Sequence, residues 1–163
     1  MKPTGMTCQT VGFRRFIPFC IAGLFLVGCA TDAPEPPPPI SFYVHPAFDI
    51  NDGRLVYMIV RNVNEKQFLD EEYNSVASKA FPSTDDPALL GRHPILPGEN
   101  KVVTVNGPAK GTVAIYFLFT YPGPYWRTIL EQPLDTSYTV ELPSQNKVTV
   151  GPEPGFFDRL FSY

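Results

Sequence analysis

Residues Val113–Tyr121 read VAIYFLFTY and form the most apolar run downstream of the first thirty residues. Glycine at position 111 precedes the run, and proline at position 122 follows it. Both residue types interrupt regular structure, and a short, continuously apolar run is typical of a strand that is covered on both faces. We therefore predict that this run is the central strand of a β-sheet.

Shorter strand patterns lie on both sides of this run. Each is rich in β-branched or aromatic residues, or alternates apolar with polar residues, and turn residues separate one from the next. Some eight short strands of this kind predict an all-β fold built as a two-sheet β-sandwich. The other predicted strands are Ile40–Val44, Leu55–Val60, Gly91–Leu96, Val102–Val105, Trp126–Leu130, Ser137–Leu142 and Lys147–Val150.

The segment Glu65–Ala80 departs from this pattern, because its apolar residues recur at helical spacing. We predict one short amphipathic helix there, lying on the domain and ending before Pro82. Consecutive helical residues point in different directions, so we expect Glu71 and Glu72 to be solvated and not to form an acid–base pair. The apolar positions of the predicted helix are Phe68, Leu69, Tyr73, Val76 and Ala80.

A polar segment joins the first two predicted strands. Asn, Asp and Gly tolerate positive φ, so this segment is predicted to be a turn. It begins like a calcium loop, but the twelfth position is Val60, where a calcium loop requires a bidentate glutamate. We therefore do not predict a calcium site. The residues of the turn are Asp49, Ile50, Asn51, Asp52, Gly53 and Arg54.

The first 28 residues have the layout of an export signal. Their only charged residues are basic, and a run of twelve mostly apolar residues, Phe16–Val27, follows them. A bilayer core of ~30 Å needs roughly 20 helical residues to cross it, so this run predicts a removable signal peptide and no membrane span. Met6 is an alternative start, and it leaves this interpretation unchanged.

The apolar run ends in Leu26, Val27 and Gly28, directly before Cys29. This order resembles the lipobox of bacterial lipoproteins, in which small residues let the peptidase approach the backbone and the cysteine thiol accepts a diacylglyceryl group. We predict diacylglyceryl and N-acyl lipid on Cys29 and no other cofactor. An ordinary signal peptide beside an unrelated cysteine is the alternative.

Cleavage before Cys29 would leave one cysteine, ten basic residues and sixteen acidic residues. The resulting formal net charge of −6 offers no electrostatic footprint for nucleic acid or for anionic lipid head groups. Residues 29–39, with four prolines in Pro36–Pro39, are predicted to be the lipidated N-terminus and an extended spacer. The domain 40–150 and an apolar tail, 151–163, follow. Ala30 after the cysteine is typical of lipoproteins sent to the outer membrane, facing the periplasm.

Few residues suit catalysis or metal binding. The histidines His45 and His93 have no partner at helical or hairpin spacing, whereas a zinc site needs three or four clustered ligands. We expect each to be a solvated or capped strand residue. No serine has a G-x-S-x-G context, and no glycine loop for phosphate is present. We predict a protein that works by binding and is not an enzyme.

Tyr121, Tyr125 and Trp126 surround a Pro-Gly-Pro turn. They either line a site for a peptide or a small ligand or pack on the edge of the sheet. The first alternative would make the chain a periplasm-facing lipoprotein that serves as a general binding module.

The tail presents an apolar side over one or two helical turns, formed by Phe156, Phe157, Leu160 and Phe161. Exposing four large apolar groups is unfavourable. The tail therefore either packs back on the sandwich or docks on a partner.

Across residues 40–150, the order of several short motifs resembles the TssJ (SciN) family of type VI secretion system lipoproteins. After the lipobox and spacer, Asn51–Arg54 leads into a hydrophobic strand. The most telling part is LLGR at residues 89–92, followed by LPGE at residues 96–99. The other pieces are Phe68 in the helix, the strand Val113–Phe119, the pair Trp126-Arg127, and the segments Val140–Leu142 and Asn146–Val148.

The resemblance implies a sandwich of the transthyretin-like or Ig-like kind with one short added helix. It also implies an assembly component that tethers the type VI membrane complex to the outer membrane by binding the periplasmic C-terminal domain of TssM. In that family the loop between the first two strands contacts the partner. The resemblance therefore assigns Asp49–Arg54 as partner-binding residues.

Overall fold

The burial of alternate residues explains how the strands form. In β1 (Pro39–Pro46) every second residue is buried, as in a strand that has one face against a core. In β5 (Thr112–Leu118) every residue after the first is buried, as in a strand with a layer on each face. The computed structural model describes residues 36–81 and 86–153. The predicted signal peptide, its lipobox with Cys29, and the apolar residues of the tail lie outside these ranges.

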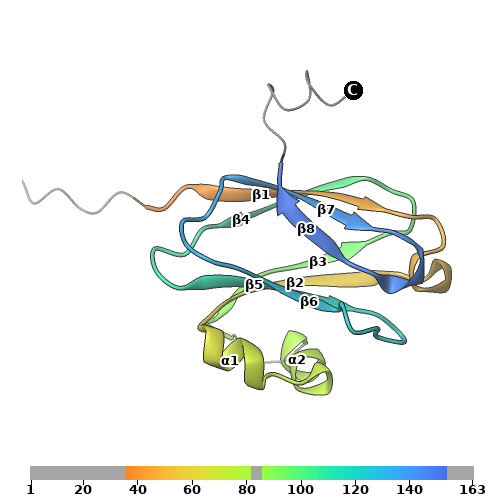
Figure 1. Cartoon of the computed structure of the whole chain (residues 1–163), viewed down its shortest axis with the longest axis horizontal. Helices are drawn as coiled ribbons and strands as arrows, with labels where there is room; N and C mark the ends of the chain where they lie inside the picture. Colours follow the sequence, from red (N-terminus) through yellow and green to blue (C-terminus); the bar gives the residue numbers. More distant parts are fainter. Residues whose placement is uncertain (1–35, 82–85, 154–163) are drawn as a thin grey trace, which may run out of the picture. The chain divides into compact units, whose positions relative to one another are not determined.

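The remaining strands are β2 (Val56–Val63), β3 (Leu89–Ile95), β4 (Lys101–Asn106), β6 (Arg127–Leu130), β7 (Ser137–Leu142) and β8 (Thr149–Pro152). Within the described ranges, the strands form two four-stranded sheets, seen one above the other in Figure 1. The first sheet has the order β4-β1-β7-β8, and only its β1–β7 pair is parallel. The second has the order β3-β2-β5-β6 and is antiparallel throughout. The predicted two-sheet β-sandwich is confirmed.

Two hydrophobic cores lie on the two faces of the second sheet. The core between the sheets contains Phe42, Met58 and Phe117, all of which are fully buried. The core on the other face contains Ile59 and Tyr116. Successive strand residues point to opposite faces, so neighbouring residues of β2 and β5 serve different cores. This arrangement confirms the prediction that the run beginning at Val113 is a central strand covered on both faces.

Two short helices, α1 (Glu65–Asp70) and α2 (Tyr73–Ala80), cover the core on the outer face of the second sheet. They lie below that sheet in Figure 1. Our prediction of one continuous helix over this segment is wrong, because Glu71 and Glu72 have extended backbone. The guanidinium of Arg127 donates hydrogen bonds to the carbonyls of Phe68 and Glu71. These carbonyls are therefore satisfied without further helical turns, which allows the chain to break there.

The break places the Glu71 side chain between the helices and the second sheet. Glu71 is 6% exposed, so our prediction that it is solvated is wrong, whereas Glu72 is exposed as predicted. The Glu71 carboxylate pairs with Arg61 and, at 3.4 Å, with Lys79. It also accepts a hydrogen bond from the Tyr116 hydroxyl. A buried carboxylate is tolerated here because three groups compensate its lost hydration.

The same network continues to Asp86, whose carboxylate lies 2.9 Å from a guanidinium nitrogen of the buried Arg61. Burial by itself would raise the pKa of Glu71, but the hydrogen bonds from Tyr116 and Arg61 outweigh it and lower that pKa. Burial and the hydrogen bond to Glu71 raise the pKa of Tyr116. Glu71 is therefore ionised and Tyr116 neutral at neutral pH.

Within residues 36–81 and 86–153, no helix is both long enough and apolar enough to cross a membrane.

Candidate functional site

The strand register brings four loops to one end of the sandwich. β1 and β7 run in parallel, so their final residues Pro46 and Leu142 are paired. β2 begins at the same end, because Val56 pairs with Ile95 at the end of β3, and β5 ends beside it. We call this the loop end, and it lies at the right of Figure 1. It consists of residues 47–55, 96–100, 119–126 and 143–148.

Asn51 connects three of these loops. It lies in a 3-10 turn, Ile50–Gly53. Its backbone N–H donates to Oδ1 of Asn146 at 2.9 Å, and its Nδ2 donates to the carbonyl of Leu55 at 2.9 Å. Its Oδ1 accepts from the N–H of Thr120 at 2.7 Å. The Asn51 side chain, with both a donor and an acceptor, thus joins the β1–β2 and β5–β6 loops, and its backbone N–H adds the β7–β8 loop.

The backbone of this turn requires the residue types found there. Asn51, Asp52 and Gly53 have φ values of 53°, 55° and 72°, so three successive residues are left-handed. Asn, Asp and Gly adopt this region at lower cost than other residues do. The sequence prediction of a turn is therefore confirmed, and the turn is held by tertiary contacts as well as by its own residue types.

Two further hydrogen bonds tie the loops together. The Ser144 hydroxyl donates to Oδ1 of Asp49 at 2.7 Å, and Nδ2 of Asn146 donates to the carbonyl of Tyr121 at 3.1 Å. Side chains that bridge loops restrict the conformations that the loops can adopt. The loop end is therefore preorganised for binding.

The six residues predicted to bind a partner divide into two groups. Ile50 and Asn51 are buried, with exposed fractions of 0% and 3%, and they support the turn from inside. The other four are exposed and form the outer surface of the turn: Asp49, Asp52, Gly53 and Arg54.

Large apolar side chains surround this turn. Tyr121 and Tyr125 were considered only as part of a possible ligand site, and Phe48 and Leu96 were not predicted as site residues. Phe48 is 85% exposed, Tyr121 71% and Tyr125 55%, and Leu96 is also exposed. The ring of Phe48 lies where a Cβ on Gly98 would be, so the glycine makes room for it. We call Phe48, Leu96, Tyr121 and Tyr125 the apolar rim. The signal in the sequence was the presence of large apolar residues inside turn segments, where polar residues are usual.

The three aromatic residues proposed to line a ligand site do not act together. Trp126 packs edge-on against Tyr73, with ring centroids 5.0 Å apart, and lies 5.6 Å from the Tyr116 ring. It therefore belongs to the packing under the helices. Tyr121 and Tyr125 remain at the surface, where the Lys147 ammonium lies 5.9 Å from the centre of the Tyr125 ring.

The described part of the chain holds no group of three or more His, Cys, Asp or Glu side chains that could bind a metal ion. We predicted that His93 is a solvated or capped residue. This prediction is wrong, because the Nε2 atom of His93 is buried and has no hydrogen-bond partner. Burial, and then the nearby charge of Lys101, lower the pKa of His93, so it is neutral at neutral pH.

Comparison with known proteins finds one matching family model and several solved structures of the same fold. The family model described as "IglE, N-terminal domain" matches residues 57–142. No curated protein matches the sequence significantly.

Solved structures share the fold at low sequence identity. The lipoprotein TssJ1 of Pseudomonas aeruginosa is 14% identical with a TM-score of 0.57, over 74% of this chain and 99% of its own. Lip of Serratia marcescens, a membrane-bound component of the type VI secretion system, is 13% identical with a TM-score of 0.60. The match covers 73% of this chain and 99% of Lip. A chain of a type VI membrane complex is 16% identical with a TM-score of 0.55. The match covers 71% of this chain and 99% of that one. The fold implied by the TssJ resemblance is therefore confirmed.

Proposed function

The chain belongs to the IglE N-terminal domain family, a family of type VI secretion lipoproteins, and from this membership we propose that it anchors a type VI membrane complex to the outer membrane. In this proposal, lipid on Cys29 holds the protein in the membrane, and the loop end binds the periplasmic C-terminal domain of TssM. The role is one of assembly, by binding and not by catalysis.

The position of the loop end relative to the N-terminal segment carries this proposal. β1 starts at Pro39 and runs toward the loop end, so the chain enters the sandwich at the opposite end. A lipid attached upstream of β1 leaves the four loops directed away from the point of attachment. The membrane and the partner can thus be engaged at the same time.

The chemistry of the loop end suits a protein partner. Exposed aromatic residues supply much of the binding energy in protein interfaces, and the surrounding polar residues supply specificity. Here the apolar rim stands beside the exposed Asp49, Asp52 and Arg54. The bridging hydrogen bonds of Asn51 reduce the entropy that the loops lose on binding.

The two attachments support each other. Each buried methylene of an acyl chain contributes about 0.8 kcal/mol to membrane binding, so two or three chains make a lasting anchor. Copies held at one membrane also present their loop ends at a high effective concentration. Each contact with TssM can therefore be of modest affinity.

A binding measurement tests the loop end. Phe48→Ser and Tyr121→Ser, made together, should weaken binding to the periplasmic C-terminal domain of TssM by at least about tenfold, because interface aromatics act as hot spots. Surface plasmon resonance with the immobilised partner gives the dissociation constant.

The matched control is Leu69→Ser, because Leu69 is 63% exposed but lies on α1, away from the loop end. This variant should bind as the wild type does. Equal affinity for wild type and the double variant would exclude the apolar rim as the binding surface.

A further inference from the structure

Among the described strands, each sheet has two edges, formed by β4 and β8 in the first sheet and by β3 and β6 in the second. Three of these edges have features that oppose further pairing. β3 contains Pro94, and the carbonyl of Pro94 accepts a hydrogen bond from the Lys101 ammonium at 2.7 Å. β6 has only four residues, and β8 has four and ends in Pro152. Prolines, lysines and short length are common means of preventing strand pairing at an edge.

The fourth edge, β4, has none of this protection along most of its length. It has six residues with the sequence KVVTVN, and it pairs with β1 in one unbroken register. Valine and threonine favour strands, and residues 102–106 carry no charge. The only charged residue of β4 is Lys101, whose ammonium is directed to β3. β4 is therefore open to pairing with another strand.

The backbone groups that β4 offers follow from the register. The N–H of Ser41 in β1 bonds toward β7, so the next residue, Phe42, directs its backbone groups to β4, where it pairs with Val103. The neighbours of Val103, Val102 and Thr104, therefore direct theirs away from the sheet. No hydrogen bond between described residues uses these backbone groups. Both side chains are exposed as well.

This pattern of free groups defines the kind of ligand. Val102 and Thr104 each offer one N–H donor and one carbonyl acceptor. Alternate residues of a strand lie roughly 6.8 Å apart, which is also the repeat of donors and acceptors along any extended backbone. The ligand that satisfies all these groups is an extended polypeptide segment, added to the sheet as a fifth strand.

A hollow on the outer face of the first sheet indicates the side chain that such a segment carries. It lies where β4 begins, has a volume of about 170 Å³, and has a mostly apolar lining that includes Tyr43, His45, Asn100 and Val102. A cavity of roughly 150 Å³ holds a benzene ring. Long side chains reach diagonal neighbours on the next strand, so an added strand can place a leucine, methionine or phenylalanine there.

We propose that β4 accepts an extended strand from the partner that binds the loop end, with one long apolar side chain of that strand in the hollow. The inference rests on the proposed function. β4 begins at Lys101, directly after the loop 96–100, which carries Leu96 of the apolar rim. A segment that leaves the apolar rim at this loop can therefore continue along β4 without a break.

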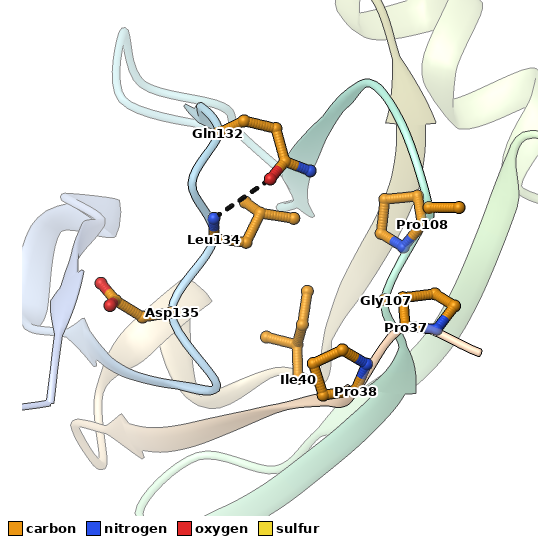
Figure 2. A pocket seen from close by; sticks show the side chains of 9 residues that line it. Pro37, Pro38, Ile40, Gly107, Pro108, Gln132, Leu134 and Asp135 are labelled. Carbon is orange, nitrogen blue, oxygen red and sulfur yellow. Dashed lines mark hydrogen bonds between the residues drawn. The ribbon is translucent and has the colours of Figure 1, made fainter. Parts of the chain in front are cut away.

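The other end of β4 limits the length of the added strand. After Asn106 the chain crosses to β5 in the second sheet. Gly107 and Pro108 then line a different pocket, together with Pro37 and Pro38 from the start of the chain's first strand (Figure 2). The pairing is therefore confined to the six residues of β4, or roughly 20 Å.

A second copy of this chain fits the edge less well than a strand of the partner. Two copies of one strand that pair about a two-fold axis must run antiparallel. The two sandwiches would then direct their loop ends in opposite directions, whereas the proposed function has all copies face one way from one membrane. A strand supplied by the partner has no such restriction.

Hydrogen exchange on the full chain in detergent tests the pairing directly. The amides of Val102 and Thr104 should exchange fast in the free protein, whereas the amide of Val103, which bonds to β1, should exchange slowly. Adding the periplasmic C-terminal domain of TssM should slow the amides of Val102 and Thr104 by at least about tenfold. Mass spectrometry with fragmentation to single residues gives these rates.

A proline substitution tests the same contact by affinity. Thr104→Pro removes an outward N–H and leaves the ladder with β1 intact, so binding to the TssM domain should weaken by about tenfold. Val150→Pro is the matched control and should bind as the wild type does. The N–H of Val150 also points away from the sheet, but at the opposite edge, two residues before the native Pro152. Thermal unfolding shows whether both variants are folded, and the exchange rates of the wild type decide the question if one is not.

The outcomes separate this inference from the proposed function. If the wild type does not bind the TssM domain, the proposed function is wrong and the strand pairing falls with it. If it binds while Val102 and Thr104 still exchange fast, the loop end stands and the pairing at β4 is overturned. Slow exchange of these amides in the free protein also overturns it, because the edge is then already covered. Sedimentation velocity distinguishes a cover from the same chain, in a monomer, from a second copy, in a dimer.

Discussion

At the scale of single residues, Asn51 does most to hold the loop end in one shape. Its backbone is left-handed, and its amide bonds to Leu55 and Thr120 while its N–H bonds to Asn146. Alanine has neither the amide nor the same tolerance of positive φ. Asn51 therefore stabilises the conformation of the turn that is predicted to bind the partner.

Asn51→Ala should lower the free energy of unfolding by about 3 kcal/mol, because buried backbone groups lose their partners and the left-handed turn is strained. Urea denaturation followed by circular dichroism measures this loss. Asp52→Asn, at the neighbouring exposed and left-handed position, is the control and should keep wild-type stability. A stable Asn51→Ala protein would contradict the role of Asn51.

At the scale of elements, the ion-pair network fixes the helices to the second sheet. Glu71 lies between α1 and α2, and Arg61 lies in β2, so their contact joins two layers. Removing one partner of a buried ion pair leaves an uncompensated charge in an apolar region. The attachment of the helical layer therefore depends strongly on this one pair.

Glu71→Gln should destabilise the domain by roughly 3 kcal/mol at neutral pH, because Arg61 loses a buried counter-charge. The folded state lowers the pKa of Glu71, so the unfolded state binds the proton more readily. The wild type thus has the full contribution above about pH 4.3 and loses it as the pH falls through the folded pKa.

Thermal unfolding between neutral pH and pH 3 measures both effects. The stability of Glu71→Gln should depend less on pH over the acidic range than that of the wild type. Glu72→Gln is the control, because Glu72 is adjacent but exposed. Equal losses in the two variants would show that the ion pair is not responsible.

At the scale of the whole molecule, the sandwich separates two surfaces. β1 begins and β8 finishes at the end of the sandwich opposite the loop end, whereas the loop end presents the apolar rim. Strand direction alone produces this separation, because β1 runs toward the loop end, parallel to β7, and β8 runs back, antiparallel to β7. This separation is what the proposed function requires, since that proposal puts the lipid tether upstream of β1 and the partner at the loop end.

Cys29→Ser should abolish incorporation of labelled palmitate and move most of the protein out of the membrane fraction, because acyl chains supply most of the binding energy. Cys8→Ser, upstream of the predicted cleavage position, is the control and should leave both measurements unchanged. Label that persists in Cys29→Ser would overturn the lipobox assignment.

The sandwich and its turns were predictable because they follow from local chemistry. Alternate burial along β1 and the continuous apolar run of β5 are visible residue by residue. The Asn-Asp-Gly order likewise predicts a turn with positive φ without knowledge of its neighbours. The lipid on Cys29 and the contact with TssM stay predictions, since no described residue tests them.

The sequence by itself determined that the chain forms a two-sheet β-sandwich with a tight turn at Asn51–Gly53, because strand periodicity and turn preferences act between near neighbours. Only the tertiary structure decided that the helical segment breaks at Glu71, that this carboxylate is buried against Arg61, and that Phe48 and Tyr121 share one end of the molecule. The physical reason is that these features depend on pairing and on desolvation by residues far away along the chain, which no local pattern contains.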